Sequence, residues 1–216
     1  MGSIMMHLYI SEIYKEKHKL GNKFLIGSVL PDIYKKTIMN RDESHYIEIV
    51  KKKDEVFKLP NIDKFIKENK EKKSDEITMG YLAHLVEDYI WFRYIINKQV
   101  RECGKDESGN PQYRYKKEKF KVLHNSEHFT GNIYADYSYL DIALIERIPI
   151  DIEEIEKETL EFLGDDEKSK KIVKEQLHMH RGFEERENCF ITDKVLSKYI
   201  RMSLRMLEKE LKRFAK

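Results

Sequence analysis

The stretch YLAHLVEDYIWF, residues 81 to 92, places an imidazole and two carboxylates among apolar and aromatic side chains. His84 and Asp88 are four residues apart, so on a helix they share one face, with Cβ atoms roughly 6 Å apart. The apolar residues around them predict that this helix is buried. Because a buried carboxylate is costly unless it is paired or binds a metal, Asp88 needs a partner. That partner is either a basic side chain such as Arg93 or a metal ion.

Three further residues suit the same chemistry. His7 lies in an apolar stretch, Asp32 follows the proline that is expected to end a buried segment, and His45 lies at the start of a predicted helix. Each alone has an ordinary interpretation, as a core histidine, a turn residue or a surface histidine. Together with His84 and Asp88 they make three imidazoles and two carboxylates, which are suitable ligands for one or two zinc-like ions.

Four short segments carry these residues in an order that resembles the zinc-dependent phospholipase C family. They are MHL near the start, FLIGSVLPDI, SHY and YLAHLVED. The superfamily also includes the S1/P1-type nucleases, and its members are all-α proteins that hold two or three zinc ions among their helices. The similarity covers residues 4 to 92, under half of the chain. It implies an all-α bundle of the phospholipase C and P1 nuclease type and a hydrolase of phosphoric esters.

The resemblance also implies a role for each residue. Asp32, His45, His84 and Asp88 correspond to ligands of one zinc, Asp88 would bridge to a second zinc, and His7 would be another ligand. Asp32 would also act as the catalytic general base toward the attacking water. Two metal ions can hold a hydroxide at neutral pH and clamp phosphate oxygens. We therefore expect one or two zinc ions, or other divalent transition metals, and a phosphate-ester substrate such as a phospholipid.

Other polar residues are weaker candidates. The histidine that holds a third zinc in the family has no counterpart just after Asp88, so a third ion would need His124 or His128, which are four residues apart. Asp136 and Asp141, in the aromatic stretch YADYSYLD, could line a pocket near the site. In the family the processed N-terminal residue itself binds a metal, whereas His7 lies several residues into this chain.

The chain predicts a single all-α domain over residues 1–216, with the metal-site elements in residues 1–92. Few prolines and glycines and abundant Lys, Glu, Leu and Ile favour helices. We expect Pro31 to end the second helix and leave Asp32 in a loop, and Ser44 to cap the third. No run is long enough to predict a strand. The expected helices are 3–20, 23–30, 44–55, 62–71, 76–102, 114–126, 131–147, 152–163, 167–181 and 192–214.

Composition narrows the class of protein. Lys and Arg number 41 against 39 Asp and Glu, so no dedicated nucleic-acid-binding surface is evident. The two cysteines form no CxxC pattern, which argues against a disulfide framework and favours an intracellular protein. No apolar run is long enough for a transmembrane segment, and the start does not fit a signal peptide. We expect a cytoplasmic protein.

Three alternatives remain open from the sequence. The same site could serve a nuclease-type phosphodiesterase. An HD-type phosphohydrolase is also helical and metal-bound, but it needs His followed directly by Asp, which this sequence lacks. A non-catalytic helical protein that binds metal or another protein needs only a polar core. The enzyme interpretation requires the five residues to converge on a cleft that water can enter.

Overall fold

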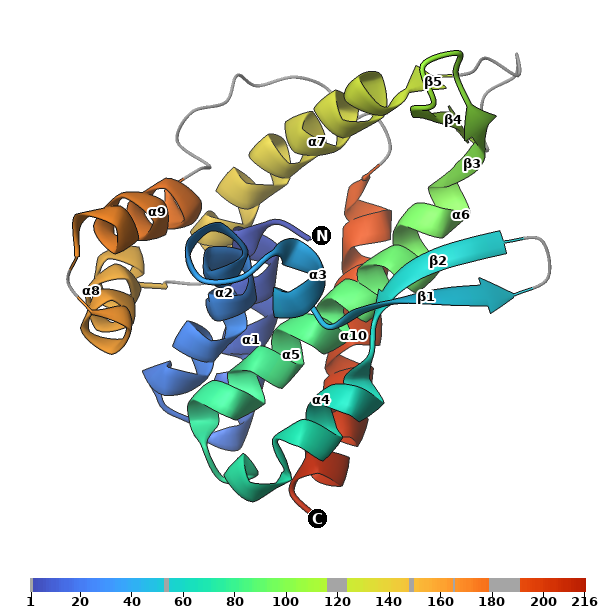
Figure 1. The fold of residues 1–216 in the computed structure, drawn as a ribbon. Helices are drawn as coiled ribbons and strands as arrows, with labels where there is room; N and C mark the ends of the chain where they lie inside the picture. Colours follow the sequence, from blue (N-terminus) through green and yellow to red (C-terminus); the bar gives the residue numbers. More distant parts are fainter. Residues whose placement is uncertain (1, 53–54, 116–123, 148–149, 165, 179–190) are drawn as a thin grey trace.

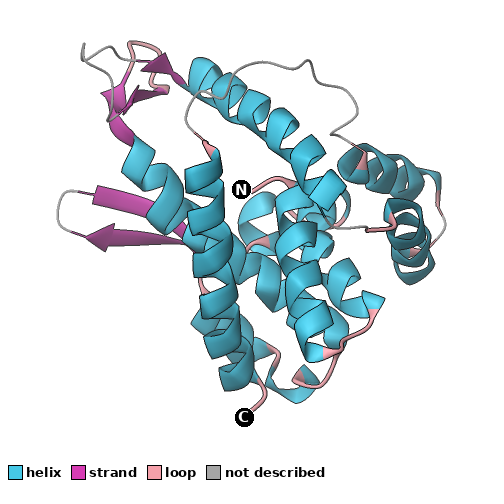
Figure 2. Ribbon diagram, turned by 180° about the vertical axis from the view of Figure 1, so that it is seen from behind, coloured by secondary structure: helices cyan, strands magenta, loops and turns pink. Residues whose placement is uncertain are grey.

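The computed structural model describes residues 2–52, 55–115, 124–147, 150–164, 166–178 and 191–216. Most of these residues are helical, and the expected all-α class is confirmed (Figure 2). A 3-10 turn (Lys70–Lys72) follows α4, and a π-helix (Trp91–Ile96) joins α5 to α6. The α-helices are α1 (Ile4–His18), α2 (Asn22–Thr37), α3 (Arg41–Ser44), α4 (Ile62–Glu68), α5 (Glu76–Ile90), α6 (Asn97–Gln99), α7 (Ser126–Arg147), α8 (Ile152–Leu163), α9 (Glu167–Leu177) and α10 (Asp193–Phe214).

Capping residues set where several helices begin. Ser3, Asp75, Asp151 and Thr192 are the N-caps of α1, α5, α8 and α10, and each side chain accepts a hydrogen bond from a backbone N–H of the first turn. Such caps satisfy N–H groups that have no partner inside the helix. The predicted range 152–163 agrees with α8, and 192–214 agrees closely with α10.

Pro31 lies inside α2, so the prediction that it ends the helix is wrong. A proline in a helix interior lacks the N–H that would bond to the carbonyl four residues earlier, and it costs about 3 kcal/mol. The segment from Phe24 to Ile33 is buried, and burying so much apolar surface outweighs that cost. Asp32 therefore lies on a helix, and its position is fixed by the packing of α2.

Two small antiparallel sheets correct the expectation of an all-helical chain. The first pairs β1 (Ile47–Lys52) with β2 (Glu55–Pro60), and the second has the order β3 (Val100–Lys105), β4 (Pro111–Tyr115), β5 (His124–Asn125). In β2, Phe57 and Leu59 are buried while Lys58 is exposed, which is the alternation of a half-buried strand. The β-branched residues of IEIVKK favour a strand over a helix.

The predicted helix 44–55 is the clearest error. The chain forms the short helix α3, whose N-cap Asn40 and Glu43 make a reciprocal capping box. Ser44 thus ends a helix and does not cap one. His45 follows α3, and Tyr46 adopts a left-handed backbone conformation with φ 52° before β1 begins. His45 is therefore held at the end of a capped helix.

Other helix boundaries differ from the predicted ranges. The helix predicted at 76–102 ends at Gln99, and β3 begins at the next residue. The helix predicted at 131–147 begins earlier, because α7 starts at Ser126. The predicted helix 114–126 is wrong at its described ends, since 114–115 belong to β4 and 124–125 to β5, and Ser126 begins α7; residues 116–123 lie outside the described residues. The range 167–181 ends at Leu177 in α9, and its last residues are also outside the described part of the chain.

Two glycines let α2 and α5 approach each other closely. A Cβ atom on Gly27 would lie 2.1 Å from the carbonyl oxygen of Ile77, and one on Gly80 would lie 2.0 Å from that of Phe24. Only glycine fits at such backbone contacts. Figure 1 shows α5 between α1 and α2 on one side and α10 on the other. This packing brings residues 7, 32, 84 and 88 into one core.

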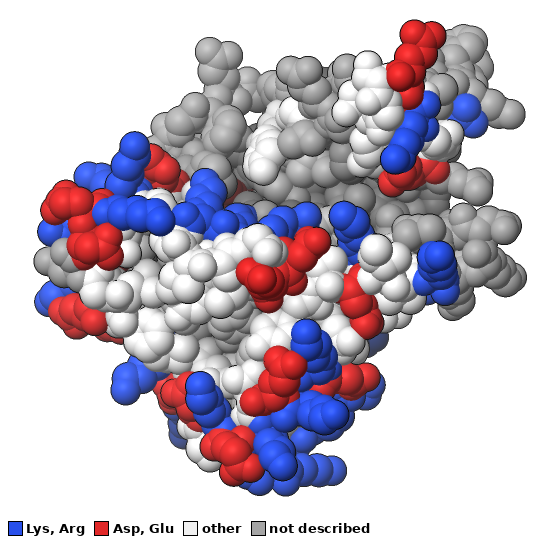
Figure 3. All heavy atoms as spheres, viewed as in Figure 1, with Lys and Arg blue, Asp and Glu red and all other residues white. Residues whose placement is uncertain are grey.

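The surface is mixed in charge. On the face drawn in Figure 3, basic and acidic side chains are interspersed around an uncharged area. Among the described residues, no helix is both long enough and apolar enough to cross a membrane.

Candidate metal centre

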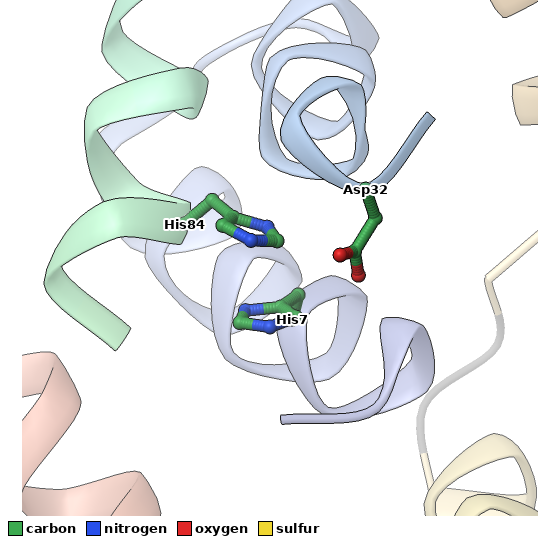
Figure 4. A group of neighbouring side chains, drawn as sticks. All are labelled: His7, Asp32 and His84. Carbon is green, nitrogen blue, oxygen red and sulfur yellow. The ribbon is translucent and has the colours of Figure 1, made fainter. Parts of the chain in front are cut away.

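The structure brings all five predicted ligands together. His7, Asp32 and His84 have ligand atoms that all lie within 4.8 Å of one another, and so do His45, His84 and Asp88. Figure 4 shows the rings of His7 and His84 stacked, with the carboxylate of Asp32 directed toward them. The two ring centroids are 3.9 Å apart. The side chains come from α1, α2, α5 and the end of α3, so the close packing of these helices builds the cluster.

Each histidine is oriented by a hydrogen bond at Nδ1. His7 Nδ1 lies 2.7 Å from Glu87 Oε2, and His84 Nδ1 lies 2.7 Å from the carbonyl oxygen of Ser28. His45 Nδ1 lies 2.8 Å from Ser44 Oγ, and that hydroxyl also lies within hydrogen-bond distance of the Arg41 carbonyl. Metal-binding histidines are held in this way, with Nδ1–H donated to a carboxylate or carbonyl oxygen. In its neutral form, a histidine that donates its Nδ1–H in this way presents Nε2 as the atom available to a metal.

Two of these Nε2 atoms and one carboxylate oxygen lack partners in the described part of the chain, whereas His45 Nε2 lies 3.2 Å from Asp32 Oδ1. Among the described residues, His7 Nε2, His84 Nε2 and Asp88 Oδ2 are buried and form no hydrogen bond. Buried polar atoms without a partner are uncommon and costly. Their presence among the two groups of ligand-type atoms is consistent with bound cations, which would supply the missing partners.

The separations between these atoms also suit a metal. Asp88 Oδ2 lies 3.9 Å from both His45 Nε2 and His84 Nε2, and Asp32 Oδ1 lies 3.2 Å from His45 Nε2. Ligand atoms of a tetrahedral zinc lie about 3.4 Å from one another, because each is about 2.0–2.1 Å from the ion. The other oxygen of Asp88, Oδ1, lies 3.5 Å from His7 Nε2. Asp88 thus faces His7 with Oδ1, which also accepts a hydrogen bond from the Gly2 N–H at 3.1 Å, and faces His45 and His84 with Oδ2.

The electrostatics of the cluster reflect its acidic partners. Burial alone would lower the pKa of His7, but Asp88 and Glu87 raise it to about 10. Burial and the neighbouring His7 lower the pKa of His84 well below its usual value. Burial works against ionisation of Asp88, yet the adjacent positive groups hold its pKa below the usual range. The cluster therefore attracts positive charge, whether as a proton on His7 or as a metal ion.

Asp32 has a second partner that the sequence did not indicate. Lys35, one turn further along α2, places Nζ 2.6 Å from Asp32 Oδ1. Burial opposes ionisation of Asp32, but Lys35 and His45 keep its pKa well below the usual range. An ionised carboxylate is suited to binding a cation. The same low pKa makes Asp32 a weak proton acceptor.

Arg93 is not the partner of Asp88. Its guanidinium lies over the ring of Phe57, 4.2 Å from the centroid. Asp136 Oδ2 accepts a hydrogen bond from the backbone N–H of Ile191, and Asp141 accepts one from Ser3 Oγ. These two carboxylates therefore tie segments together and line no described pocket. His124 and His128 lie in β5 and α7, and their side chains are outside the described part of the structure.

Sequence reasoning missed the residues that support the ligands. Glu87 orients His7, Ser44 orients His45, and Lys35 holds Asp32. For Glu87 a signal was present, since a carboxylate in an apolar helix needs a partner just as Asp88 does. Ser44 and Lys35 had no comparable signal, because their roles depend on the turn after α3 and on the continuation of α2 past Pro31.

The cluster is buried, and a pocket lies beside it. The five candidate ligand residues are 0–3% exposed. A pocket of about 1440 Å³ is lined by aromatic residues that include Tyr34, Tyr46 and Tyr81, and none of the five residues lines it. The Tyr81 hydroxyl donates to the carbonyl oxygen of Ser44, at 2.5 Å. Tyr81 and Ser44 therefore form a layer between this pocket and His45.

Comparisons of the chain with family models, with curated proteins and with solved structures found no match.

Proposed function

We propose that this protein binds one or two divalent transition-metal ions, zinc foremost, through His7, Asp32, His45, His84 and Asp88. We further propose that it uses them to hydrolyse a phosphoric ester, as the resemblance to zinc-dependent phospholipase C implies. One observation carries the proposal: three imidazoles and two carboxylates form two overlapping groups of ligand-type atoms, and three of these atoms, His7 Nε2, His84 Nε2 and Asp88 Oδ2, are buried without a hydrogen bond among the described residues. Such a donor set suits zinc.

A bound ion would supply Lewis-acid activation of water and of phosphoryl oxygens at neutral pH. The protein's own groups prepare the centre for it. Glu87, Ser28 and Ser44 fix the tautomers of the three histidines, so that each presents Nε2. Asp88 stays ionised between His7 and the other two histidines. Burial of the five residues strengthens the electrostatic interactions between them, and hydrolysis additionally requires a movement that admits water and substrate.

Asp32 is the residue that we propose as general base, although Lys35 favours its ligand role. The two roles separate experimentally. Asp32→Asn would abolish activity in both cases, but it would lower metal affinity only if Asp32 is a ligand. If Asp32→Asn retains its metal content but loses turnover, the result would support the general-base role of Asp32.

The substrate class follows from the resemblance, and a phospholipid heads the candidates. A nuclease-type activity at the same site is less favoured, because the chain's charge is nearly balanced and nucleic-acid-binding proteins carry a basic excess. We propose a cytoplasmic location on the basis of the cysteine usage.

A second candidate function is a non-catalytic metal centre that stabilises the helices. The burial of all five ligands favours it, as does the layer of Tyr81 and Ser44 between the cluster and the pocket. Structural zinc sites are closed in this way, whereas catalytic ones keep an open position.

The first experiment is elemental mass spectrometry of protein purified without chelator. We expect one to two zinc, manganese or iron ions per chain, lost in Asp88→Asn. The matched control is Asp136→Asn, a buried carboxylate that accepts a hydrogen bond from the Ile191 N–H and is not one of the five candidate ligands. Hydrolysis of bis(p-nitrophenyl) phosphate and of phosphatidylcholine vesicles then separates the two candidates. Folded wild-type protein that binds no added zinc would refute both.

A further inference from the structure

Tyr199 of α10 has a buried hydroxyl that the packing of the fold does not require. Its side chain is 0% exposed, and its oxygen forms no hydrogen bond within the described part of the chain. The ring packs edge-on against Trp91, with centroids 5.0 Å apart. A buried hydroxyl without a partner costs about 1–3 kcal/mol. Phenylalanine would fill the same space without that cost. The presence of the hydroxyl therefore indicates that it interacts with a group outside the packed side chains.

The hydroxyl lies next to Gly2, as does the candidate ligand atom His7 Nε2. Tyr199 Oη and His7 Nε2 each lie 3.2 Å from the position that a Cβ atom on Gly2 would take. Two unpartnered polar atoms therefore flank a residue that has no side chain. Burial, followed by the charges of Glu87 and Asp88, raises the pKa of Tyr199 well above its usual value. The phenol consequently stays protonated and is available as a hydrogen-bond donor.

Ser203 does not account for the Tyr199 hydroxyl. It lies one turn further along α10, and it is also buried. Its Oγ is close enough to oppose the rise that burial causes in the pKa of Tyr199, but neither hydroxyl forms a hydrogen bond of acceptable geometry among the described residues. The groups that surround Tyr199 from the neighbouring helices are His7 on α1 and Glu87 and Asp88 on α5. A protonated phenol beside this cluster has a natural acceptor in a bound anion.

We propose that the Tyr199 hydroxyl donates a hydrogen bond to an anion held at the metal centre, namely a phosphate-ester substrate or inorganic phosphate. The inference rests on the proposed function, because the metal centre must hold the other oxygens of the anion. Tyr199 is then a binding residue contributed by the far end of the chain, outside the segment 4–92 that carries the family resemblance. It would fix the position of the phosphoryl group relative to His7.

Two titrations of the full-length protein test this role. Zinc affinity is measured first, by competition with a chromophoric chelator, in wild type and in Tyr199→Phe. Inorganic phosphate is then titrated into the zinc-loaded proteins by calorimetry. We expect Tyr199→Phe to keep wild-type zinc affinity and to weaken phosphate binding about tenfold or more, since a hydrogen bond to a charged group is lost. Ser203→Ala, the matched loss of a buried hydroxyl on the same helix, should change neither.

The other outcomes are also decisive. Loss of zinc affinity in Tyr199→Phe would make the tyrosine a metal ligand and overturn the donor role. Unchanged phosphate affinity in Tyr199→Phe, an equal loss in Ser203→Ala, or zinc-loaded wild type that binds no phosphate would each overturn the inference while leaving the metal centre intact. Wild type that binds no zinc would remove the proposed function and, with it, the anion site. A thermal melt of each variant confirms that it is folded.

Discussion

Gly27 and Gly80 lie at the crossing of α2 and α5, where each glycine contacts the backbone of the other helix. The Cβ position on Gly27 lies 3.0 Å from the Cα atom of Gly80. Asp32 is five residues past this point on α2, and His84 is one turn past it on α5. The hydrogen bond from His84 Nδ1 to the Ser28 carbonyl crosses the same interface. The glycine contact therefore sets the distance between candidate ligands from two helices.

Gly80→Ala tests the importance of this crossing. The added methyl would lie 2.0 Å from the Phe24 carbonyl oxygen, so the helices must move apart. We expect a loss of about 1–3 kcal/mol or more in the free energy of unfolding, measured by urea denaturation, together with weaker zinc binding. Gly131→Ala is the control, because nothing lies within 4 Å of its Cβ position on α7. That change should stabilise the protein by about 0.5–1 kcal/mol. Equal effects of the two substitutions would contradict the close approach.

The glycine contact shows why part of the site was predictable. A G-x-x-x-H-x-x-x-D pattern on an apolar stretch indicates a helix that buries Gly80, His84 and Asp88 on one face, and α5 does so. The helices predicted at 152–163 and 192–214 follow from the helical propensity of their own residues, and the structure agrees with both. The pattern does not predict which other helices α5 packs against. The partners of the cluster come from other segments, so they appear only when tertiary packing is known.

The errors share a physical cause. Pro31 normally ends a helix, but here the burial of its neighbours outweighs its backbone cost. The strand β1 follows from the turn at Tyr46 and from pairing with β2, which lies further along the chain. Both outcomes depend on contacts between distant residues, and local propensity, although the β-branched residues of β1 favour a strand, does not identify those contacts.

Acid should weaken the contact between α1 and α10 through Glu208. Its carboxylate lies 2.5 Å from Lys17 Nζ and 2.7 Å from His18 Nε2, and these two partners lower its pKa to about 2. A lowered pKa in the folded state means that the stabilisation is complete above the ordinary value of 4.5 and is lost as the pH falls toward 2. We expect the melting temperature of wild type to fall more steeply over this range than that of Glu208→Gln.

The effect at Glu208 should be modest and sensitive to salt, because the pair is partly exposed. Glu175→Gln is the control, since Glu175 makes only a longer contact of 3.9 Å with Lys171 on the surface of α9. Its acid profile should match that of wild type. A Glu208→Gln profile that coincides with wild type would mean that the contact contributes nothing measurable.

Asn40 positions His45 through the short helix α3. Its side chain accepts a hydrogen bond from the Glu43 N–H, and Glu43 reciprocates. Asn40→Ala should cost about 1 kcal/mol of stability, and it should also lower zinc affinity because α3 ends next to His45. Asp166→Ala removes the N-cap of α9, far from the cluster in sequence. It should lower the melting temperature and leave zinc affinity unchanged. Similar zinc affinities in the two variants would show that α3 does not hold His45 in place.

Glu87 should tune the metal centre without binding the metal. Its Oε2 orients His7 through Nδ1, and its Oε1 accepts a hydrogen bond from Ser11. Burial raises the pKa of Glu87 to about 7, while His7 opposes that rise. Removing such a support typically costs 10–100-fold in metal affinity. We therefore expect Glu87→Gln to weaken zinc binding about tenfold in a chelator competition assay, while the zinc-loaded protein still binds one equivalent at saturation.

The control for Glu87 is Glu12→Gln. Glu12 is also buried, on α1, but it pairs with Lys15 at 2.9 Å and has no contact with a candidate ligand. The zinc affinity of the Glu12→Gln variant should equal that of wild type, even if the stability of the variant is lower. A loss of zinc affinity in Glu12→Gln as large as that in Glu87→Gln would attribute the effect to general weakening of α1. If Glu87→Gln binds zinc as tightly as wild type, then the His7–Glu87 contact is part of a metal-free polar core, and His7 is not a ligand.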